Sequence, residues 1–358
     1  MAPRGTLAGF SGWGNPCAGT VFSANTVTAG DPFPATIAVP LSPDAGQEPQ
    51  TLPWAARPLR ELLRLSWPIA LSMLSYSLMT LVDTIFVARL GSAELAGVGL
   101  AGTASFAILC FSIGLLRAVK TLVSQAVGAG QGEETGAHLG AGLLVAAVLG
   151  VLTIFVGQIV AELLRGIAAT AASGDAARSY LRVRALSAPL VLAYVALRET
   201  RYGRGDARSP MVATILANIV NVALAYLFIF PVGWGVAGAA FATVLAQGVE
   251  AGVLCLQQTR LGWGISRTRR EHLRALWRIG LPTGIQFTLE IGAFTLLAGL
   301  IAALSEAEMA AHQIALQVIH FSFLPAFAVS ESASVMVGQA VGADRDALVL
   351  RVARQALL

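Results

Sequence analysis

Charge is scarce in this sequence. Charged side chains make up 12% of its 358 residues and hydrophobic side chains 56%, whereas a soluble domain has about 25% charged and about 45–50% apolar residues. So few charges cannot cover a water-soluble surface of this size, and we therefore expect the chain to fold in a lipid bilayer. Lys120 is the only lysine, so the net positive charge comes from arginines. These occur in short clusters between apolar runs, which is not the extended basic surface of a nucleic-acid-binding protein.

Cysteine is also rare, and the usual enzyme motifs are missing. Cys17, Cys110 and Cys255 are odd in number and far apart, which excludes a disulfide framework and a zinc site. The sequence has no phosphate-binding loop, no HExxH and no GxSxG. We therefore expect no enzyme activity and no cofactor, and the sequence indicates an ion gradient rather than ATP as an energy source.

Long apolar runs begin only after residue 60. Residues 1–56 are rich in Gly, Pro, Ala, Ser and Thr, and we interpret them as a disordered N-terminal extension. The following runs are long enough to cross about 30 Å of hydrocarbon. Eight spans are predicted, at about 61–90, 95–127, 137–164, 176–201, 209–231, 234–259, 272–303 and 307–341. A ninth is expected to begin near Asp346. The fold class is therefore an all-α polytopic membrane protein.

Arginine is distributed unevenly between the two ends of these spans. If the N-terminus is cytoplasmic, the cytoplasmic segments hold sixteen arginines and the outer segments five, all between Arg89 and Arg184. Because cytoplasmic loops carry the excess of positive charge, we predict a cytoplasmic N-terminus in a plasma or inner membrane.

The sequence also repeats itself at a shift of 214 residues. Leu59–Pro68 aligns with Leu273–Pro282, and Ser124–Ala129 aligns with Gly338–Ala343 without a gap. Six spans fill one period, so the two copies are parallel, as in many secondary transporters. We therefore predict two pseudo-twofold-related six-helix bundles, with a first lobe at 57–260. A second lobe begins at 261–358 and is incomplete, which suggests a truncated chain.

Two carboxylates fall inside predicted spans. Asp83 lies in the first span and Glu290 in the seventh. A carboxylate at membrane depth costs a few kcal/mol and by default marks a functional site. A buried carboxyl group can also exchange protons near neutral pH. We therefore select Asp83 and Glu290 as cation-coupling residues, with a purely structural hydrogen-bonding role as the alternative.

Uncharged polar residues accompany them. Asn218 and Asn221 lie one helical turn apart and can face one cavity, and Thr243 is a weaker candidate because it can bond to its own helix. Arg117 and Lys120, with Glu331 at the repeat equivalent of Arg117, either pair structurally or line an aqueous path. The remaining candidates for lining a substrate cavity are Gln286, His312, Gln313, Gln317 and His320, although a structural role is favoured for the two histidines.

Several motifs together resemble the multidrug and toxic compound extrusion (MATE) family. They cover about residues 57–358 in the order typical of the family. Each motif alone is only weakly specific for the family, and the five together are a specific signal. The matching segments are Trp67-Pro68 through VDTIFVARLG (82–91), SQAVGAG (124–130), RGDARSP (204–210), GVAGAA (235–240) and AAHQIAL (310–316).

The resemblance implies two six-helix lobes around a cavity and a monomer that exchanges protons or sodium for cationic and amphiphilic organic molecules. It implies that Asp83 is the first-lobe coupling carboxylate, with Asn221 and Thr243 as partners, and that Glu290 is the second-lobe cation site. Ala225 stands where family members often have an aspartate, which weakens the case for bound sodium and favours protons. The alternatives are a flippase for lipid-linked precursors, hinted at by Arg117 and Lys120, and an inactive truncated product.

Overall fold

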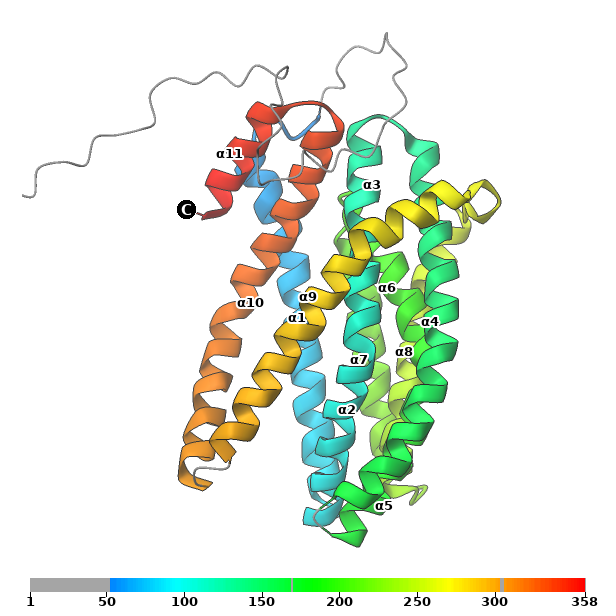
Figure 1. Ribbon diagram of the computed structural model, residues 1–358, viewed down its shortest axis with the longest axis vertical. Helices are drawn as coiled ribbons and strands as arrows, with labels where there is room; N and C mark the ends of the chain where they lie inside the picture. The colour runs from blue at the N-terminus through cyan, green and yellow to red at the C-terminus, as the bar shows by residue number, and fades with distance from the viewer. Residues whose placement is uncertain (1–51, 169, 303–305, 358) are drawn as a thin grey trace, which may run out of the picture. The chain divides into compact units, whose positions relative to one another are not determined.

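The computed structural model describes residues 52–168, 170–302 and 306–357. Between residues 295 and 321 it describes only the side chains of Leu296, Leu297, Ala315 and Ile319. All regular structure in these residues is helical, which confirms the all-α class (Figure 1). In chain order the helices are α1 (Pro58–Ala88), α2 (Ser92–Leu116), α3 (Ala118–Gly128), α4 (Gly132–Ile167), α5 (Ala171–Ala185), α6 (Ala188–Gly203), α7 (Arg208–Ile229), α8 (Gly235–Thr259), the 3₁₀ turn η1 (Ile265–Arg267), α9 (Arg270–Ala302), α10 (Glu306–Gly342) and α11 (Asp346–Leu357).

Each predicted span falls on one of these helices or on a consecutive pair. Among the described residues, five segments are long and apolar enough to cross a membrane, and α5 with α6, bent by 51°, makes a sixth. The seventh and eighth predicted spans lie on α9 and α10, and α11 begins at Asp346 as expected. Arg178, Arg182 and Arg184, which were counted among the arginines of the outer segments, lie within a helix, because α4 ends at Ile167 and α5 begins at Ala171.

Helix α4 shows how the sequence suits a lipid environment. Its large side chains Val148, Phe155 and Ile159 are at least 63% exposed and share one face at helical spacing. The opposite face is lined by small residues such as Gly142, Gly150 and Gly157, which are in close contact with neighbouring helices. Small residues toward helices and large apolar residues toward the outside are the arrangement expected where lipid is the solvent.

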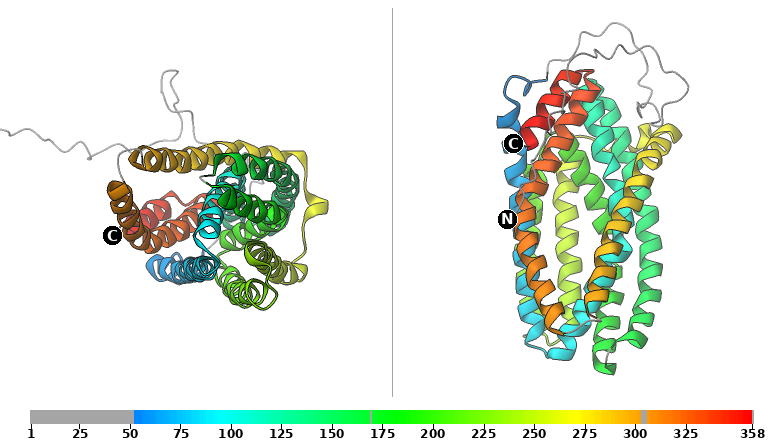
Figure 2. Two further views of the ribbon diagram at one scale, coloured as in Figure 1. Left: turned by 90° about the horizontal axis from the view of Figure 1, so that it is seen from below. Right: turned by 60° about the vertical axis from the view of Figure 1, so that its left-hand side comes forward.

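The internal repeat is visible in the helix boundaries. A shift of 214 residues places the start of α2 on the start of α10, the end of α3 on the end of α10, and the start of α4 on the start of α11. One difference remains, because Arg117 interrupts the α2–α3 pair whereas α10 is continuous. α10 packs against α3 and α1, and α9 packs against α2 (Figure 2), so the second copy begins on the surface of the first.

Reciprocal glycine contacts join the two copies. A Cβ atom on Gly128 would lie 2.0 Å from the backbone oxygen of Gln339, and one on Gly342 would lie 2.0 Å from that of Gln125. These two contacts are exchanged by the 214-residue shift, as expected for segments related by a twofold axis. α3 and α10 therefore meet at their C-terminal ends through backbone packing that only glycine permits.

Substituting Ala for Gly128 or Gly342 is expected to lower thermal stability in detergent. The added methyl group meets backbone atoms that cannot rotate away, and overpacking of this kind costs about 1–3 kcal/mol. Gly102→Ala is the matched control, because a Cβ atom on this helical glycine has no neighbour within 4 Å. Equal melting temperatures for the Gly128 and Gly102 variants would contradict the contact.

Candidate functional site

Asp83 lies in a cluster of polar side chains from four helices. The amide nitrogen of Asn221 on α7, in the orientation that satisfies its neighbours, donates to the two carboxylate oxygens of Asp83 at 2.9 and 3.2 Å. The other amide atom of Asn221 lies 3.3 Å from Oγ1 of Thr243 on α8. Tyr180 on α5 hydrogen-bonds Thr243 in turn. The structure thus brings together Asp83, Asn221 and Thr243.

The surroundings of this cluster are largely apolar. Asn221 is fully buried, and Ala225, one turn further along α7, is also fully buried against Val87 and Ala239. Ala225, which stands where family members often have an aspartate, is therefore part of an apolar core. Asp83 is held by an amide and makes no ion pair within the described residues, although Arg184 on α5 is close enough for the two charges to interact.

Asn218 lies on the same face of α7 as Asn221, but its side chain bonds α1 and not Asp83. Its side chain donates to Oγ of Ser75 on α1 at 2.8 Å. Thr214, Asn218 and Asn221 are spaced as neighbours on one face of α7. Asn218 therefore links α7 to α1 beside the Asp83 cluster and is not one of its members.

A second carboxylate of the first lobe, Glu250 on α8, was missed by sequence analysis. It accepts a hydrogen bond from Oγ1 of Thr214 at 2.7 Å, and Tyr194 on α6 bonds both groups. Tyr180 and Arg184 were missed as well, although both fall in the predicted fourth span. The helical spacing of Thr243, Gln247 and Glu250 on α8 was the signal that could have identified this stripe.

Glu290 lies in a separate cavity between the two repeats. The cavity has a volume of about 240 Å³ and is lined from α9 by Glu290, Gln286 and Thr283. The opposite wall is formed by Arg117 and Lys120. The side chains of Glu290 and Gln286 are exposed. The sequence-based expectation that Glu290 is a buried carboxylate therefore differs from the structure.

Three charged residues form a buried cluster beside this cavity. The guanidinium group of Arg117 and the ammonium group of Lys120 both bond the carboxylate of Glu331 on α10. Lys120 is 3% exposed and Glu331 is 7% exposed. Arg117 and Glu331 are 214 residues apart, so a residue here contacts its own repeat equivalent. Two equivalent positions can touch only on the pseudo-twofold axis, which places this ion pair at the junction of the copies.

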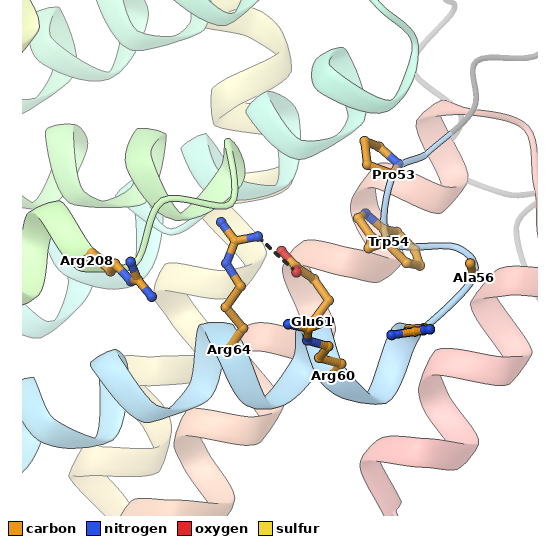
Figure 3. A pocket seen from close by; sticks show the side chains of 8 residues that line it. Pro53, Trp54, Ala56, Arg60, Glu61, Arg64 and Arg208 are labelled. Atoms are coloured by element: carbon orange, nitrogen blue, oxygen red, sulfur yellow. Dashed lines mark hydrogen bonds and ion pairs between the residues drawn. The ribbon is translucent and has the colours of Figure 1, made fainter.

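A second cavity, of about 700 Å³, lies where α1 begins. Four arginines line it, and Arg64 pairs with Glu61 at 3.2 Å (Figure 3). The lining residues are Pro53, Trp54, Ala56, Arg57, Arg60, Glu61, Arg64 and Arg208. This basic depression suits an aqueous or phosphate-rich interface rather than a hydrocarbon one.

Three cavity candidates, His312, Gln313 and Gln317, lie outside the residues whose side chains the structure describes. The same holds for His320. Their predicted contribution to a substrate cavity therefore stays a prediction.

Comparison with known proteins agrees with this architecture. A family model described as MatE matches residues 68–227 and 282–358. The chain is 31% identical over 306 residues to a probable multidrug resistance protein NorM of Pseudomonas syringae pv. tomato, covering 81% of this chain and 66% of that protein. It is 30% identical to the corresponding protein of Deinococcus radiodurans, covering 80% of this chain and 65% of that one. The chain thus spans less than two thirds of the length of these relatives.

A solved structure shares the fold. It is described as the outward-facing conformation of a multidrug resistance MATE family transporter, and it superimposes with a TM-score of 0.78 at 25% identity. The alignment covers 86% of this chain and 71% of that one. The matched residues fall in both repeats and include Asp83, Asn221 and the ion pair on the axis, but not Thr243. The chain is therefore a member of the MATE family of membrane transporters.

Proposed function

We propose that the protein is a secondary antiporter that exports organic cations and amphiphilic drugs in exchange for protons by alternating access. The main support is the Asp83 cluster, in which a carboxyl group within the helical bundle is bonded by the neutral amide of Asn221 instead of a cation. A carboxyl group without a fixed counter-charge can bind and release a cation during each cycle. Both relatives described above are named for multidrug resistance.

Protons are favoured over sodium as the coupling ion. Sodium needs several oxygen ligands, and Asp83 is the only carboxylate of its cluster because Ala225 occupies the next turn of α7. Asn221 and Thr243 offer further oxygens, so sodium is the second candidate. We further propose that a monomer acts in the plasma or inner membrane with its N-terminus in the cytoplasm. The clustered arginines at the start of α1 support that orientation.

Uptake into inverted membrane vesicles tests this function. Vesicles that contain the full-length protein and have an acidic interior are expected to accumulate a fluorescent organic cation, and accumulation is expected to stop when a protonophore is added. Uptake that follows an imposed sodium gradient, and not the proton gradient, would show that sodium is the coupling ion. Vesicles without the protein provide the baseline.

The same vesicles separate the proposal from a flippase for lipid-linked precursors. Arg117 and Lys120 at the cavity between the repeats favour this second function, because an anionic headgroup needs cationic partners. Headgroup translocation without cation uptake would favour the flippase. Absence of both activities would contradict both transport functions.

A further inference from the structure

The polar side chains of the first lobe form two stripes that connect the Asp83 cluster to Glu250. On α7 the stripe is Thr214, Asn218 and Asn221, and on α8 it is Thr243, Gln247 and Glu250. Residues at these spacings lie on one face of a helix. α7 and α8 pack against each other, and side-chain hydrogen bonds join the stripes at both ends, Asn221 to Thr243 and Thr214 to Glu250.

The two carboxylates lie at opposite ends of this polar file. Seven residues separate Thr243 from Glu250, which corresponds to about 10 Å along the helix axis. Glu250, like Asp83, makes no ion pair within the described residues and is held by neutral groups, the hydroxyls of Thr214 and Tyr194. Asp83 lies near the C-terminal end of α1, and Glu250 lies further toward the end of the bundle where α1 begins.

One arginine lies between them. Arg184 on α5 bonds Gln247 at 2.5 Å and Ser187 at 3.0 Å. Its charge acts on both Asp83 and Glu250. The other ionisable groups that act on Glu250 are on α6, namely Tyr194, Arg198 and Tyr202, while α7 contributes the hydroxyl group of Thr214.

Arg198 is already compensated by another acid. It bonds Glu199 at 2.8 Å and lies over the rings of Tyr194 and Tyr202. Asp83, Glu250 and Arg184 therefore form a group of two carboxylates and one cation, with a net charge of −1 when both acids are ionised. A single proton neutralises this group, and it can be bound by either carboxylate.

From this arrangement we propose that Glu250 is a second proton-binding site of the first lobe, which shares one coupling proton with Asp83 through Arg184. The inference depends on the proposed proton antiport. The proton leaves the carboxyl group of Asp83, which becomes a carboxylate, and binds the carboxylate of Glu250, which becomes a carboxylic acid. Water within the polar file carries it, and Arg184 then interacts mainly with Asp83. Glu250 subsequently releases the proton on the side of the membrane where α1 begins.

Replacing Glu250 with Gln separates proton binding from packing. The amide oxygen of Gln still accepts hydrogen bonds from Thr214 and Tyr194, so a role limited to joining α6, α7 and α8 is preserved. The lost proton site is expected to reduce proton-driven uptake of the fluorescent cation by about tenfold or more, which is within the usual range of coupling between two ligands. Binding of the same cation to purified protein at equilibrium is expected to stay within about twofold, because Asp83 is unchanged.

Three comparisons make the result decisive. Glu250→Asp is expected to recover part of the uptake, since it restores an ionisable carboxyl group. Glu162→Gln makes the same chemical change at an exposed pair with Arg178 and is expected to transport like the unaltered protein. If the unaltered protein transports and Glu250→Gln matches it in rate and in pH profile, the inference is wrong. If the unaltered protein shows no proton-driven uptake, the proposed function itself fails.

Discussion

Replacing Asp83 with Asn is expected to abolish proton-driven export while the protein remains folded. The amide oxygen of Asn can still accept the bond from Asn221, so the junction of α1 with α7 is conserved. The ionisable group is lost, and with it the free-energy coupling between proton and substrate, typically about 1–3 kcal/mol. We expect uptake into acidic vesicles to fall by roughly 100-fold, to the upper end of that range. Resistance of cells that express the variant should fall to that of cells without the protein.

The control for this change is Asp175→Asn. Asp175 is exposed on α5 and pairs with the exposed Arg165 at 2.8 Å. Surface pairs of this kind contribute about 0–1 kcal/mol, so neither export nor expression is expected to change. Normal export by Asp83→Asn, at an expression level equal to that of the control, would remove the basis of the proposed coupling mechanism.

The fold could be predicted to a large extent because length and hydrophobicity decide it. Each apolar run that is long enough to cross a bilayer became a helix or a consecutive pair of helices, since backbone groups in lipid must be bonded within their own segment. The shift of 214 residues was visible in sequence, and the boundaries of α10 follow those of α2 and α3 at that shift. The position of each helix and the repeat depend on the order of residues along the chain, and not on how the helices pack against one another.

The site was predicted only in part. Asp83, Asn221 and Thr243 were each found because each is a polar residue inside an apolar run, and the resemblance to the family grouped them as partners. Arg184 falls in the predicted fourth span but was counted only among the outer arginines; the helix that carries it, α5, is short, holds three arginines and is bent relative to α6. Glu250 escaped notice near the end of a long helix, where a charged residue is usually solvated. Which of these side chains face one another depends on helix rotation, which a single sequence does not reveal.

The ion pair on the axis illustrates the same limit. Sequence placed Glu331 at the repeat equivalent of Arg117 and left open whether the two pair or line an aqueous path. The structure shows the pair, because α10 passes close enough to the break between α2 and α3 for equivalent positions to touch.

Replacing Glu331 with Gln is therefore expected to destabilise the protein strongly. The carboxylate neutralises both Arg117 and Lys120, and Lys120 is 3% exposed. Removing one partner of a buried ion pair costs about 3–5 kcal/mol, because the remaining charge is left without compensation. Two uncompensated cations remain here. The melting temperature in detergent is expected to fall accordingly, and α3 and α10 are expected to separate more readily.

Comparison with other variants distinguishes the charge effect from a general packing defect. Arg117→Gln leaves the Lys120–Glu331 pair intact, and Arg117 is 26% exposed, so a smaller loss is expected. The double variant Lys120→Met with Glu331→Gln removes one cation together with the carboxylate and should recover part of the loss. Glu271→Gln, at an exposed pair with Arg269, is the neutral control. A Glu331→Gln protein as stable as this control would show that the pair on the axis does not hold the repeats together, since a buried acid with two cationic partners cannot be removed without cost.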